Sequence, residues 1–166
     1  MVKSTSMKIR VLFVCLGNIC RSPMAEAVFC HLVCEAGLQE HIEADSAGTG
    51  DWHIDSAAHP GTLAVLQEND INYNGRARCI AHADLNDFDY IVTMDDQNLS
   101  NVKRLGSGRA VVRPLLDYAA ENSGARKQFI REVPDPYFHG GFDVVYGLVR
   151  EGCEGLLQAI RDEHKL

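Results

Sequence analysis

The sequence has no long apolar run, and this absence sets the first limits on the protein. Its hydrophobic stretches fall far short of the roughly 18 residues that a membrane-spanning helix needs. A signal peptide is not expected either, because the apolar segment after Lys8 and Arg10 is short and breaks at Gly17 and Asn18. We therefore predict a cytoplasmic protein that does not act on membranes.

An excess of positive charge is also missing. The chain has 16 Lys and Arg against 23 Asp and Glu, which gives a formal net charge of -7. Proteins that bind nucleic acid usually present a basic surface, so we expect no nucleic-acid partner. Any positive character must be local to a site.

Cysteine pairs with the Cys-x2-Cys spacing are lacking too. The six cysteines match neither the framework of a small secreted domain nor a paired Cys-x2-Cys zinc site, so we expect reduced thiols and no metal. Cys30 and Cys34 fall within a predicted helix and are interpreted as structural. A chain of 166 residues with 46% hydrophobic content is enough for one well-cored domain and short for two.

What the sequence does contain is a strand, a loop and a helix in succession near its start. The apolar run from Val11 to Val14 leads into a short loop and then into an amphipathic helix predicted over 23–36, which ends at Gly37. The N–H groups of such a loop and the positive end of the helix dipole converge on one point. This order of elements predicts an anion-binding site.

Two reactive side chains bracket this loop. Cys15 lies at its start, where convergent donors and a guanidinium favour the nucleophilic thiolate. Arg21 lies at its end, and its planar fork can bind two oxygens of a tetrahedral oxyanion. A bare Cys-x5-Arg spacing is a weak signal, but Gly17 adds conformational freedom, Ser22 can cap the helix and Pro23 suits its first turn. The alternative, an ordinary turn with buried thiols, gives the arginine no purpose.

The rest of the chain alternates strands and helices. Further strands are predicted over 41–46, 90–94 and 110–113, and further helices over 57–69, 97–105 and 142–164. This alternation indicates an α/β fold, a single domain with a doubly wound, four-stranded parallel sheet flanked by helices. Asp96 is interpreted as the N-cap of its helix, and residues 117–127 read as polar and irregular. Residues 1–7 are interpreted as a mobile extension before a domain over 8–166.

Two further carboxylates are candidates for the same site. Asp95 follows the third predicted strand, and ligands of open α/β sheets bind beyond the carboxyl ends of strands, so Asp95 is expected on the same rim as Cys15. Asp135 lies between two prolines that fix the backbone on both sides and keep the residue out of a helix. Together with Cys15, this makes Asp135 the leading candidate for a general acid.

These residues resemble a known family, the low-molecular-weight protein tyrosine phosphatases. The segment similar to the phosphate-binding loop of that family is Cys15-Leu16-Gly17-Asn18-Ile19-Cys20-Arg21-Ser22-Pro23. The other similar segments are Asp45-Ser46-Ala47-Gly48-Thr49, Trp52, Ala77-Arg78, Phe88-Asp89-Tyr90-Ile91 with Met94-Asp95, and Val133-Pro134-Asp135-Pro136-Tyr137. Only about the first seven residues lie outside the resemblance.

The resemblance implies a hydrolase that removes phosphate from protein phosphotyrosine and small aryl phosphates without a metal or cofactor. Cys15 would attack phosphorus and form a phosphocysteine, while Arg21 and the N–H groups of residues 16–21 bind the phosphate oxygens. Asp135 would protonate the leaving oxygen and later deprotonate the attacking water. The implied partners are phosphotyrosine proteins, with inorganic phosphate or similar oxyanions as product and inhibitor, and the protein is expected to be a monomer.

The resemblance also assigns supporting roles around the loop. Ser22 is expected to hydrogen-bond the Cys15 thiolate, Asn18 to fix the loop through its side chain, and Ser46 to hydrogen-bond the loop. The full expected set for phosphate binding and loop support is Leu16, Gly17, Asn18, Ile19, Cys20, Ser22 and Ser46.

Two aromatic residues, Trp52 and Tyr137, are expected to flank the mouth of the pocket and hold a flat leaving group, which favours an aryl ester. Three positions depart from the pattern of many relatives. Phe138 replaces a second tyrosine and so offers no hydroxyl to phosphorylate, Gly75 stands in place of a histidine near Asn18, and Asp55 in place of a glycine.

Other functions remain open on the sequence. A protein arginine phosphatase of the same fold is the nearest rival, although such enzymes carry a threonine where this chain has Ile19. Thiol-coupled arsenate reductase needs closely spaced cysteines, and Cys79 has no such partner after it. A phosphotyrosine-binding module without activity would be expected to lack Cys15 or Asp135. Cys20 could bridge to an oxidised Cys15, or be a small buried residue.

Overall fold

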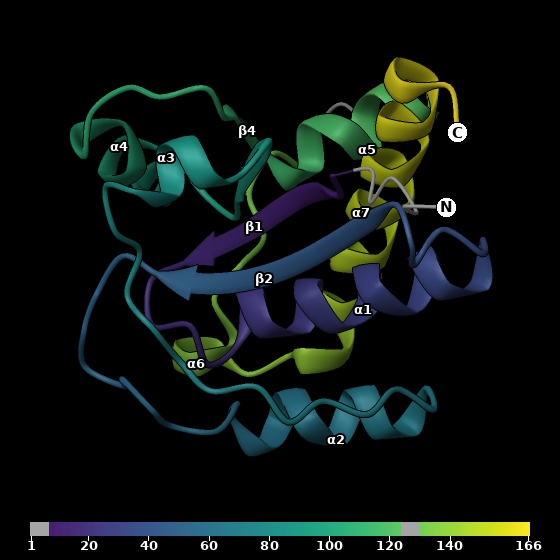
Figure 1. Ribbon diagram of the computed structural model, residues 1–166. Helices are drawn as coiled ribbons and strands as arrows, with labels where there is room; N and C mark the ends of the chain where they lie inside the picture. Colours follow the sequence, from purple (N-terminus) through teal and green to yellow (C-terminus); the bar gives the residue numbers. More distant parts are fainter. Residues whose placement is uncertain (1–6, 124–129) are drawn as a thin grey trace.

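A parallel sheet organises the chain (Figure 1). The computed structural model describes residues 7–123 and 130–166, and its four strands lie in the order β2-β1-β3-β4 with every neighbouring pair parallel. The strands are β1 (Ile9–Cys15), β2 (Ile42–Gly48), β3 (Tyr90–Thr93) and β4 (Val111–Pro114). The predicted α/β fold with a four-stranded parallel sheet is confirmed. The extension predicted over 1–7 lies, apart from Met7, outside the described residues.

Helices cover both faces of this sheet, as a doubly wound fold requires. They are α1 (Arg21–Glu35), α2 (Pro60–Glu68), α3 (Asp84–Asp87), α4 (Asp96–Arg104), α5 (Leu115–Ser123), α6 (Pro136–His139) and α7 (Phe142–His164). β1 is apolar on both faces, which is typical of an inner parallel strand. Val11 and Phe13 pack in a core with α1, α5 and α7, and Leu12 and Val14 pack in a second core with α3 and α4.

The strand order predicts where a ligand-binding crevice lies. β1 lies between β2 and β3, so the chain crosses in opposite directions on the two sides of β1. Ligands of doubly wound folds bind at such a point, beyond the carboxyl ends of the strands. The loop after β1 and Asp95 after β3 both lie there.

Two predicted helix caps are wrong. Ser22 does not cap α1, because the N-cap position is Cys20 and no side chain caps there. Asp95, and not Asp96, caps α4, in a capping box in which its carboxylate accepts from the N–H of Asn98 and the Asn98 side chain accepts from the Asp95 N–H.

Other boundaries shift as well. α2 begins at Pro60 rather than at 57, because Ala57 forms a β-bridge with Arg76. The region predicted as irregular over 117–127 is helical as far as Ser123, where α5 ends, and residues 124–127 lie outside the described part. The last helix covers 142–164, as predicted. Cys30 and Cys34 are exposed on α1 and do not belong to the core.

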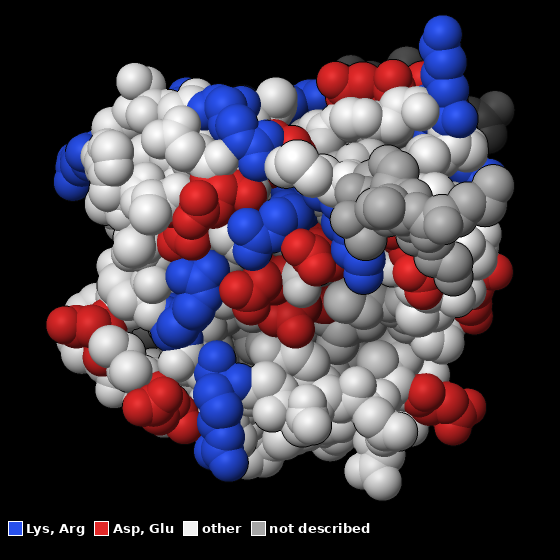
Figure 2. Space-filling model, in the orientation of Figure 1, with Lys and Arg blue, Asp and Glu red and all other residues white. Residues whose placement is uncertain are grey.

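Charged residues of both signs share the surface. Figure 2 shows Lys and Arg interspersed with Asp and Glu on the face it views. One such group is Arg78, which forms ion pairs with Asp45 at 3.1 Å and with Asp84 at 3.0 Å. Within the described ranges, no helix combines the length and the apolar character needed to cross a membrane.

Candidate active site

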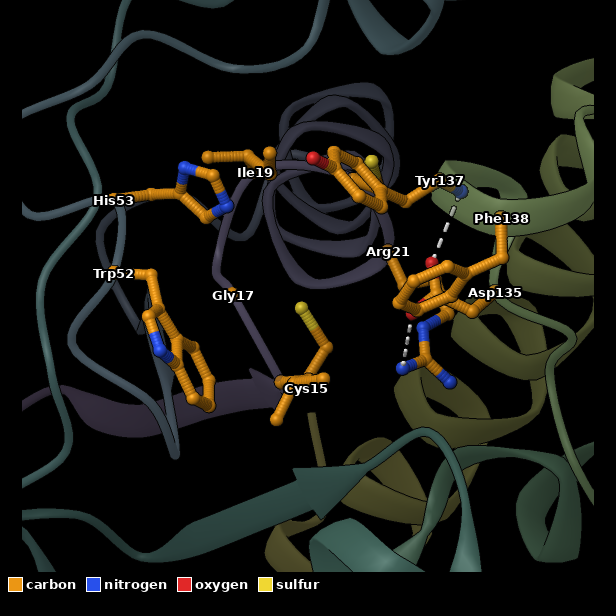
Figure 3. Close-up of a pocket in the computed structure, with 11 residues that line it drawn as sticks. Cys15, Gly17, Ile19, Arg21, Trp52, His53, Asp135, Tyr137 and Phe138 are labelled. Carbon is orange, nitrogen blue, oxygen red and sulfur yellow. Dashed lines mark hydrogen bonds and ion pairs between the residues drawn. The ribbon is translucent and has the colours of Figure 1, made fainter.

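A pocket of about 370 Å³ opens at the carboxyl end of β1 (Figure 3). Its lining residues are Cys15, Leu16, Gly17, Ile19, Cys20, Arg21, Trp52, His53, Asp135, Tyr137 and Phe138. In Figure 3 the Cys15 sulfur points into the space between Trp52 on one side and Arg21 with Asp135 on the other. The pocket therefore brings together the three residues predicted to be catalytic.

Arg21 is held in place from several elements. Its side chain is 3% exposed, and its Nη1 donates to Asp95 Oδ2 at 2.7 Å and to the carbonyl of Val133 at 3.0 Å. Its Nη2 lies 3.3 Å from Asp135 Oδ2. Burial alone would lower the pKa of Arg21, but the Cys15 thiolate and the carboxylates of Asp95 and Asp135 outweigh it and raise the pKa. A permanent positive charge thus lies beside the thiol.

A largely buried hydrogen-bond network lies behind Cys15, and we call it the floor of the site: Cys15, which lines the pocket, with Asn18, Ser22, Ser46 and Glu26, which do not. Cys15 Sγ lies 3.0 Å from Ser22 Oγ. The Asn18 side-chain amide donates to Ser22 Oγ at 2.8 Å and to Ser46 Oγ at 3.0 Å. Ser22 accepts from Asn18, and its own hydroxyl hydrogen can point either at the Ala47 carbonyl, at 3.3 Å, or at the Cys15 sulfur, at 3.0 Å.

Asn18 also gives the loop its turn. Its φ is +57°, in the left-handed region that asparagine tolerates, and its Oδ1 accepts from the N–H of Arg78 at 2.9 Å. Conformational freedom was predicted at Gly17, but Gly17 has no left-handed φ. Its missing side chain instead makes room for His53, whose Cδ2 would lie 3.1 Å from a Cβ.

Glu26 extends this floor and was missed by the sequence analysis. Its Oε1 accepts from Ser46 Oγ at 2.7 Å and from the Tyr73 hydroxyl at 3.3 Å. Burial is the main reason that its pKa rises to about 7, with Asp45 adding to the rise. The glycine at position 75, where many relatives have a histidine, has a steric reason. A Cβ at this position would come within 2.2 Å of the Tyr73 hydroxyl. The available sequence signal for Glu26 was an acidic residue among the apolar residues of the helix predicted over 23–36.

Cys20 is a buried thiol behind the loop. Burial is the main reason that its pKa rises to about 12, and the negative charges of Cys15 and Asp135 add to it. Cys15 and Cys20 are both free thiols in this structure. At this pKa Cys20 stays protonated near neutral pH and does not compete with Cys15 as a nucleophile.

The mouth of the pocket is made of exposed rings, which we define as Trp52, His53, Tyr137 and Phe138. Trp52 is 69% exposed and Tyr137 51% exposed. The Tyr137 ring lies 5.2 Å from that of Phe138 and 6.0 Å from that of His53. The sequence analysis did not assign His53 or Phe138 to the pocket, although each follows a predicted wall residue directly.

Asp135 and Asp55 each have a defined backbone environment near the pocket. Asp135 is the N-cap of the short helix α6, and its Oδ1 accepts from the N–H of Tyr137 at 3.1 Å. Asp55 has a φ of +66°, the conformation that favours the glycine found there in many relatives.

Within residues 7–123 and 130–166, no three or more His, Cys, Asp or Glu residues cluster in a way that could hold a metal ion.

Comparison with known proteins agrees with this geometry. A model of the family described as "Low molecular weight phosphotyrosine protein phosphatase" matches residues 10–166. The chain is 44% identical to the low molecular weight protein-tyrosine-phosphatase YfkJ of Bacillus subtilis over 161 residues, which is 95% of this chain and 99% of the relative. It is 42% identical to the low molecular weight phosphotyrosine protein phosphatase of Schizosaccharomyces pombe, over 92% of this chain and 97% of that protein.

Solved structures give the same result. The crystal structure of YfkJ from Bacillus subtilis superposes with a TM-score of 0.88 at 43% identity, covering 95% of this chain and 98% of the other. A drosophila arginine phosphatase superposes with a TM-score of 0.82 at 34% identity, covering 93% and 98%. From the match over nearly all of its length, and from a Cys15–Arg21 loop with the geometry of a phosphate-binding loop, the chain belongs to the low molecular weight phosphotyrosine protein phosphatase family.

Proposed function

We propose that the protein hydrolyses phosphotyrosine in proteins, and small aryl phosphates, through a phosphocysteine on Cys15. The observation that carries this proposal is the convergence of a thiol, a guanidinium and a carboxylate in one pocket with aromatic rings at its mouth. Each group has a defined role in the two chemical steps. The positive charge needed by the reaction comes from Arg21 and from the loop N–H groups, so the proposal invokes no metal.

Substrate binding exchanges one ion pair for another. The Arg21 pair with Asp95 is short, at 2.7 Å, and fixes the guanidinium, whereas the pair with Asp135 is longer, at 3.3 Å. A phosphate dianion entering the pocket competes with Asp135 for Nη2, and the buried Arg21 Nε, which has no partner among the described residues, offers a further donor. Arg21 then binds phosphate oxygens, and Asp135 is released to face the leaving group.

In the first chemical step the Cys15 thiolate attacks phosphorus in line with the ester oxygen. The S–P bond forms as the P–O bond to the aryl group breaks, and Arg21 stabilises the charge on the equatorial oxygens. Asp135, protonated at this stage, gives its proton to the departing oxygen, so the product leaves as a neutral phenol.

In the second step water attacks the phosphocysteine. Asp135 takes the proton from the water, the P–O bond forms and the P–S bond breaks. The departing Cys15 thiolate is stabilised by Arg21 and by the Ser22 hydroxyl at 3.0 Å. Inorganic phosphate is released with Asp135 protonated. The cycle closes when Asp135 re-forms its ion pair with Arg21 and returns to solvent a proton equal to the one that it took up when substrate displaced it.

The mouth favours an aryl ester. Trp52 and Tyr137 line opposite sides of the pocket in Figure 3, and flat faces on two sides of an opening can hold a phenyl ring between them. A seryl ester is shorter and has no ring, so it would leave both walls without a contact. We therefore assign phosphotyrosine rather than phosphoserine as substrate.

The test is hydrolysis of phosphotyrosine, phosphoserine and phosphoarginine peptides by the wild type and by Cys15→Ser, with chelator and reductant present. Turnover of phosphotyrosine that persists in chelator and is lost in Cys15→Ser is the expected result. A trapped phosphoenzyme in Asp135→Asn, detected by mass after quenching, would support the covalent route.

Two outcomes would overturn the proposal. A higher kcat/KM for phosphoarginine than for phosphotyrosine would make the protein an arginine phosphatase. Thiol-dependent reduction of arsenate without phosphatase activity would make it a reductase.

A further inference from the structure

The start of α2 lies against the phosphate loop and holds two consecutive carbonyl groups of it. The backbone N–H of His59 donates to the carbonyl of Ile19 at 2.7 Å. The Thr62 hydroxyl, which is fully buried, donates to the carbonyl of Cys20 at 3.1 Å. These bonds come from residues more than thirty positions further along the chain. They tie a separate helix to the loop.

These two bonds also set the direction of loop N–H groups. No peptide bond among the described residues is cis, and in a trans peptide the C=O and the following N–H point in opposite directions. Holding the carbonyls of Ile19 and Cys20 toward α2 therefore turns the N–H groups of Cys20 and Arg21 away from α2. Both N–H groups belong to the segment that is proposed to bind phosphate.

The start of α2 depends in turn on the side chain of His59. Its Nδ1 accepts from the N–H of Gly61 at 3.0 Å, so His59 is the N-cap of the helix. In this hydrogen bond Nδ1 is the acceptor. Pro60 at the first helical position completes the start. Loss of the acceptor would leave this turn free to fray.

The same ring contacts the aromatic mouth. It stacks on Phe142 with a centroid distance of 4.9 Å and an angle of 22° between the planes. Its edge meets Tyr137 at 6.1 Å and 82°. Phe142 packs in turn against the apolar cluster of Ile19, Cys20 and Ala77. His59 thus contacts both the loop that would bind phosphate and the wall that would bind the aryl ring.

We propose that His59 is a positioning residue for this site, with its cap and backbone N–H holding the phosphate loop and its ring holding Tyr137. The inference rests on the proposed function, because it assigns the cap and backbone N–H of His59 to phosphate binding and the ring contacts of His59 to aryl binding. His59 does not line the pocket.

Two variants separate the N-cap role of His59 from its ring contacts. His59→Asn keeps a good N-cap acceptor and removes the ring, whereas His59→Phe keeps a ring against Phe142 and Tyr137 and removes the acceptor. His41→Asn, at an exposed histidine in the connection before β2, is the matched control. Each protein is assayed for kcat and KM with an aryl and an alkyl phosphate, for inhibition by inorganic phosphate and for its melting temperature.

We expect opposite patterns from the two variants. In His59→Asn, KM for the aryl phosphate rises about 3- to 10-fold, while kcat and phosphate inhibition stay within about twofold, because only the wall is loosened. In His59→Phe, phosphate inhibition weakens and kcat falls by about 3- to 10-fold with both substrates, and the preference for the aryl ester is kept. His41→Asn behaves as wild type.

Two results would overturn the inference. One is a lower melting temperature with unchanged kinetic constants in both variants, which is the result of a merely structural histidine. The other is an equal loss in both variants for both substrates. If the wild type itself shows no turnover that depends on Cys15, the proposed function fails, and calorimetry of inorganic phosphate binding to the same proteins still tests whether His59 holds the loop.

Discussion

The floor and the mouth of this pocket are built on different principles. The floor is buried and polar, and hydrogen bonds fix its side chains: Asn18 alone makes three, to Ser22, Ser46 and the N–H of Arg78. The mouth is exposed and aromatic. Trp52 and Phe138 are 69% and 66% exposed, and Tyr137 is held chiefly by ring contacts.

The difference shows where the site needs accuracy. A reacting sulfur and phosphate must meet within a fraction of an ångström, and a buried network supplies that because each unmade hydrogen bond is costly. A flat leaving group needs only surface to lie against, and ring contacts tolerate small shifts. Changes to the floor should therefore affect kcat and folding, and changes to the mouth should affect KM alone.

The largest effect is expected from Arg21→Lys, at a buried residue that lines the pocket beside the floor. A lysine keeps the charge but cannot reach Asp95, the Val133 carbonyl and a phosphate with one planar fork. We expect kcat/KM for phosphotyrosine to fall by about 10³-fold and inhibition by phosphate to weaken. Steady-state kinetics with the folded variant measures both. A loss smaller than tenfold would mean that charge, and not the fork, is what the site uses.

Asn18→Ala should damage both activity and folding. It removes the amide that donates to Ser22 and Ser46 and the oxygen that accepts from the Arg78 N–H. Alanine also has no side-chain hydrogen bond to offset the strain of a φ of +57°. We expect kcat to fall by about 10- to 100-fold and stability by about 2–4 kcal/mol, measured by denaturant unfolding.

Asn18→Gly separates the two causes in that experiment. Glycine accepts the left-handed φ but makes no side-chain hydrogen bonds, so it should recover stability relative to alanine without recovering kcat. If glycine restores activity as well, the backbone turn matters and the network does not.

The matching test of the mouth is Trp52→Ala. We expect KM for phosphotyrosine peptides to rise by about 3- to 10-fold with kcat nearly unchanged, because one wall of the pocket is lost and the reacting groups are not. The melting temperature should stay the same, since the side chain is 69% exposed. A comparable fall in kcat would show that the mouth also aligns the phosphate and would remove the distinction between the two regions.

The smallest effect on activity is expected from Glu26→Gln. This variant instead tests how the buried Glu26 carboxyl changes the free energy of unfolding with pH. Burial raises the pKa of Glu26 from 4.5 to about 7 in the folded protein. A carboxyl with a raised pKa favours folding below its unfolded pKa and loses that contribution as pH rises through the folded value. From pH 5 to pH 8 the wild type should lose at most about 3 kcal/mol that the variant keeps.

Denaturant unfolding of both proteins at pH 5, 6.5 and 8 measures this difference. Glutamine can still accept from Ser46, so kcat at pH 8 should stay within about threefold of the wild type. Stability curves that run parallel with pH would show that Glu26 does not change protonation in this range.

Much of the fold could be predicted because its signals are local. The apolar run of β1 and the helical spacing over 142–164 each reflect burial of one short segment, and alternating elements restrict the topology to a doubly wound sheet. Cys15 and Arg21 could be found for the same reason, since one short loop holds both. Asp135 was suggested by its two flanking prolines.

Tertiary structure alone decided which polar groups meet. Ser22 turns to Cys15 instead of capping α1, and Asp95 both caps α4 and fixes Arg21. Glu26 accepts from Ser46 on β2, and the His59 N–H reaches the loop from the start of α2. The physical reason is that a strand or helix depends on neighbours a few residues away, which the sequence by itself displays. A hydrogen bond in a buried site depends on which donor lies within 3 Å in space, and only the folded chain determines that.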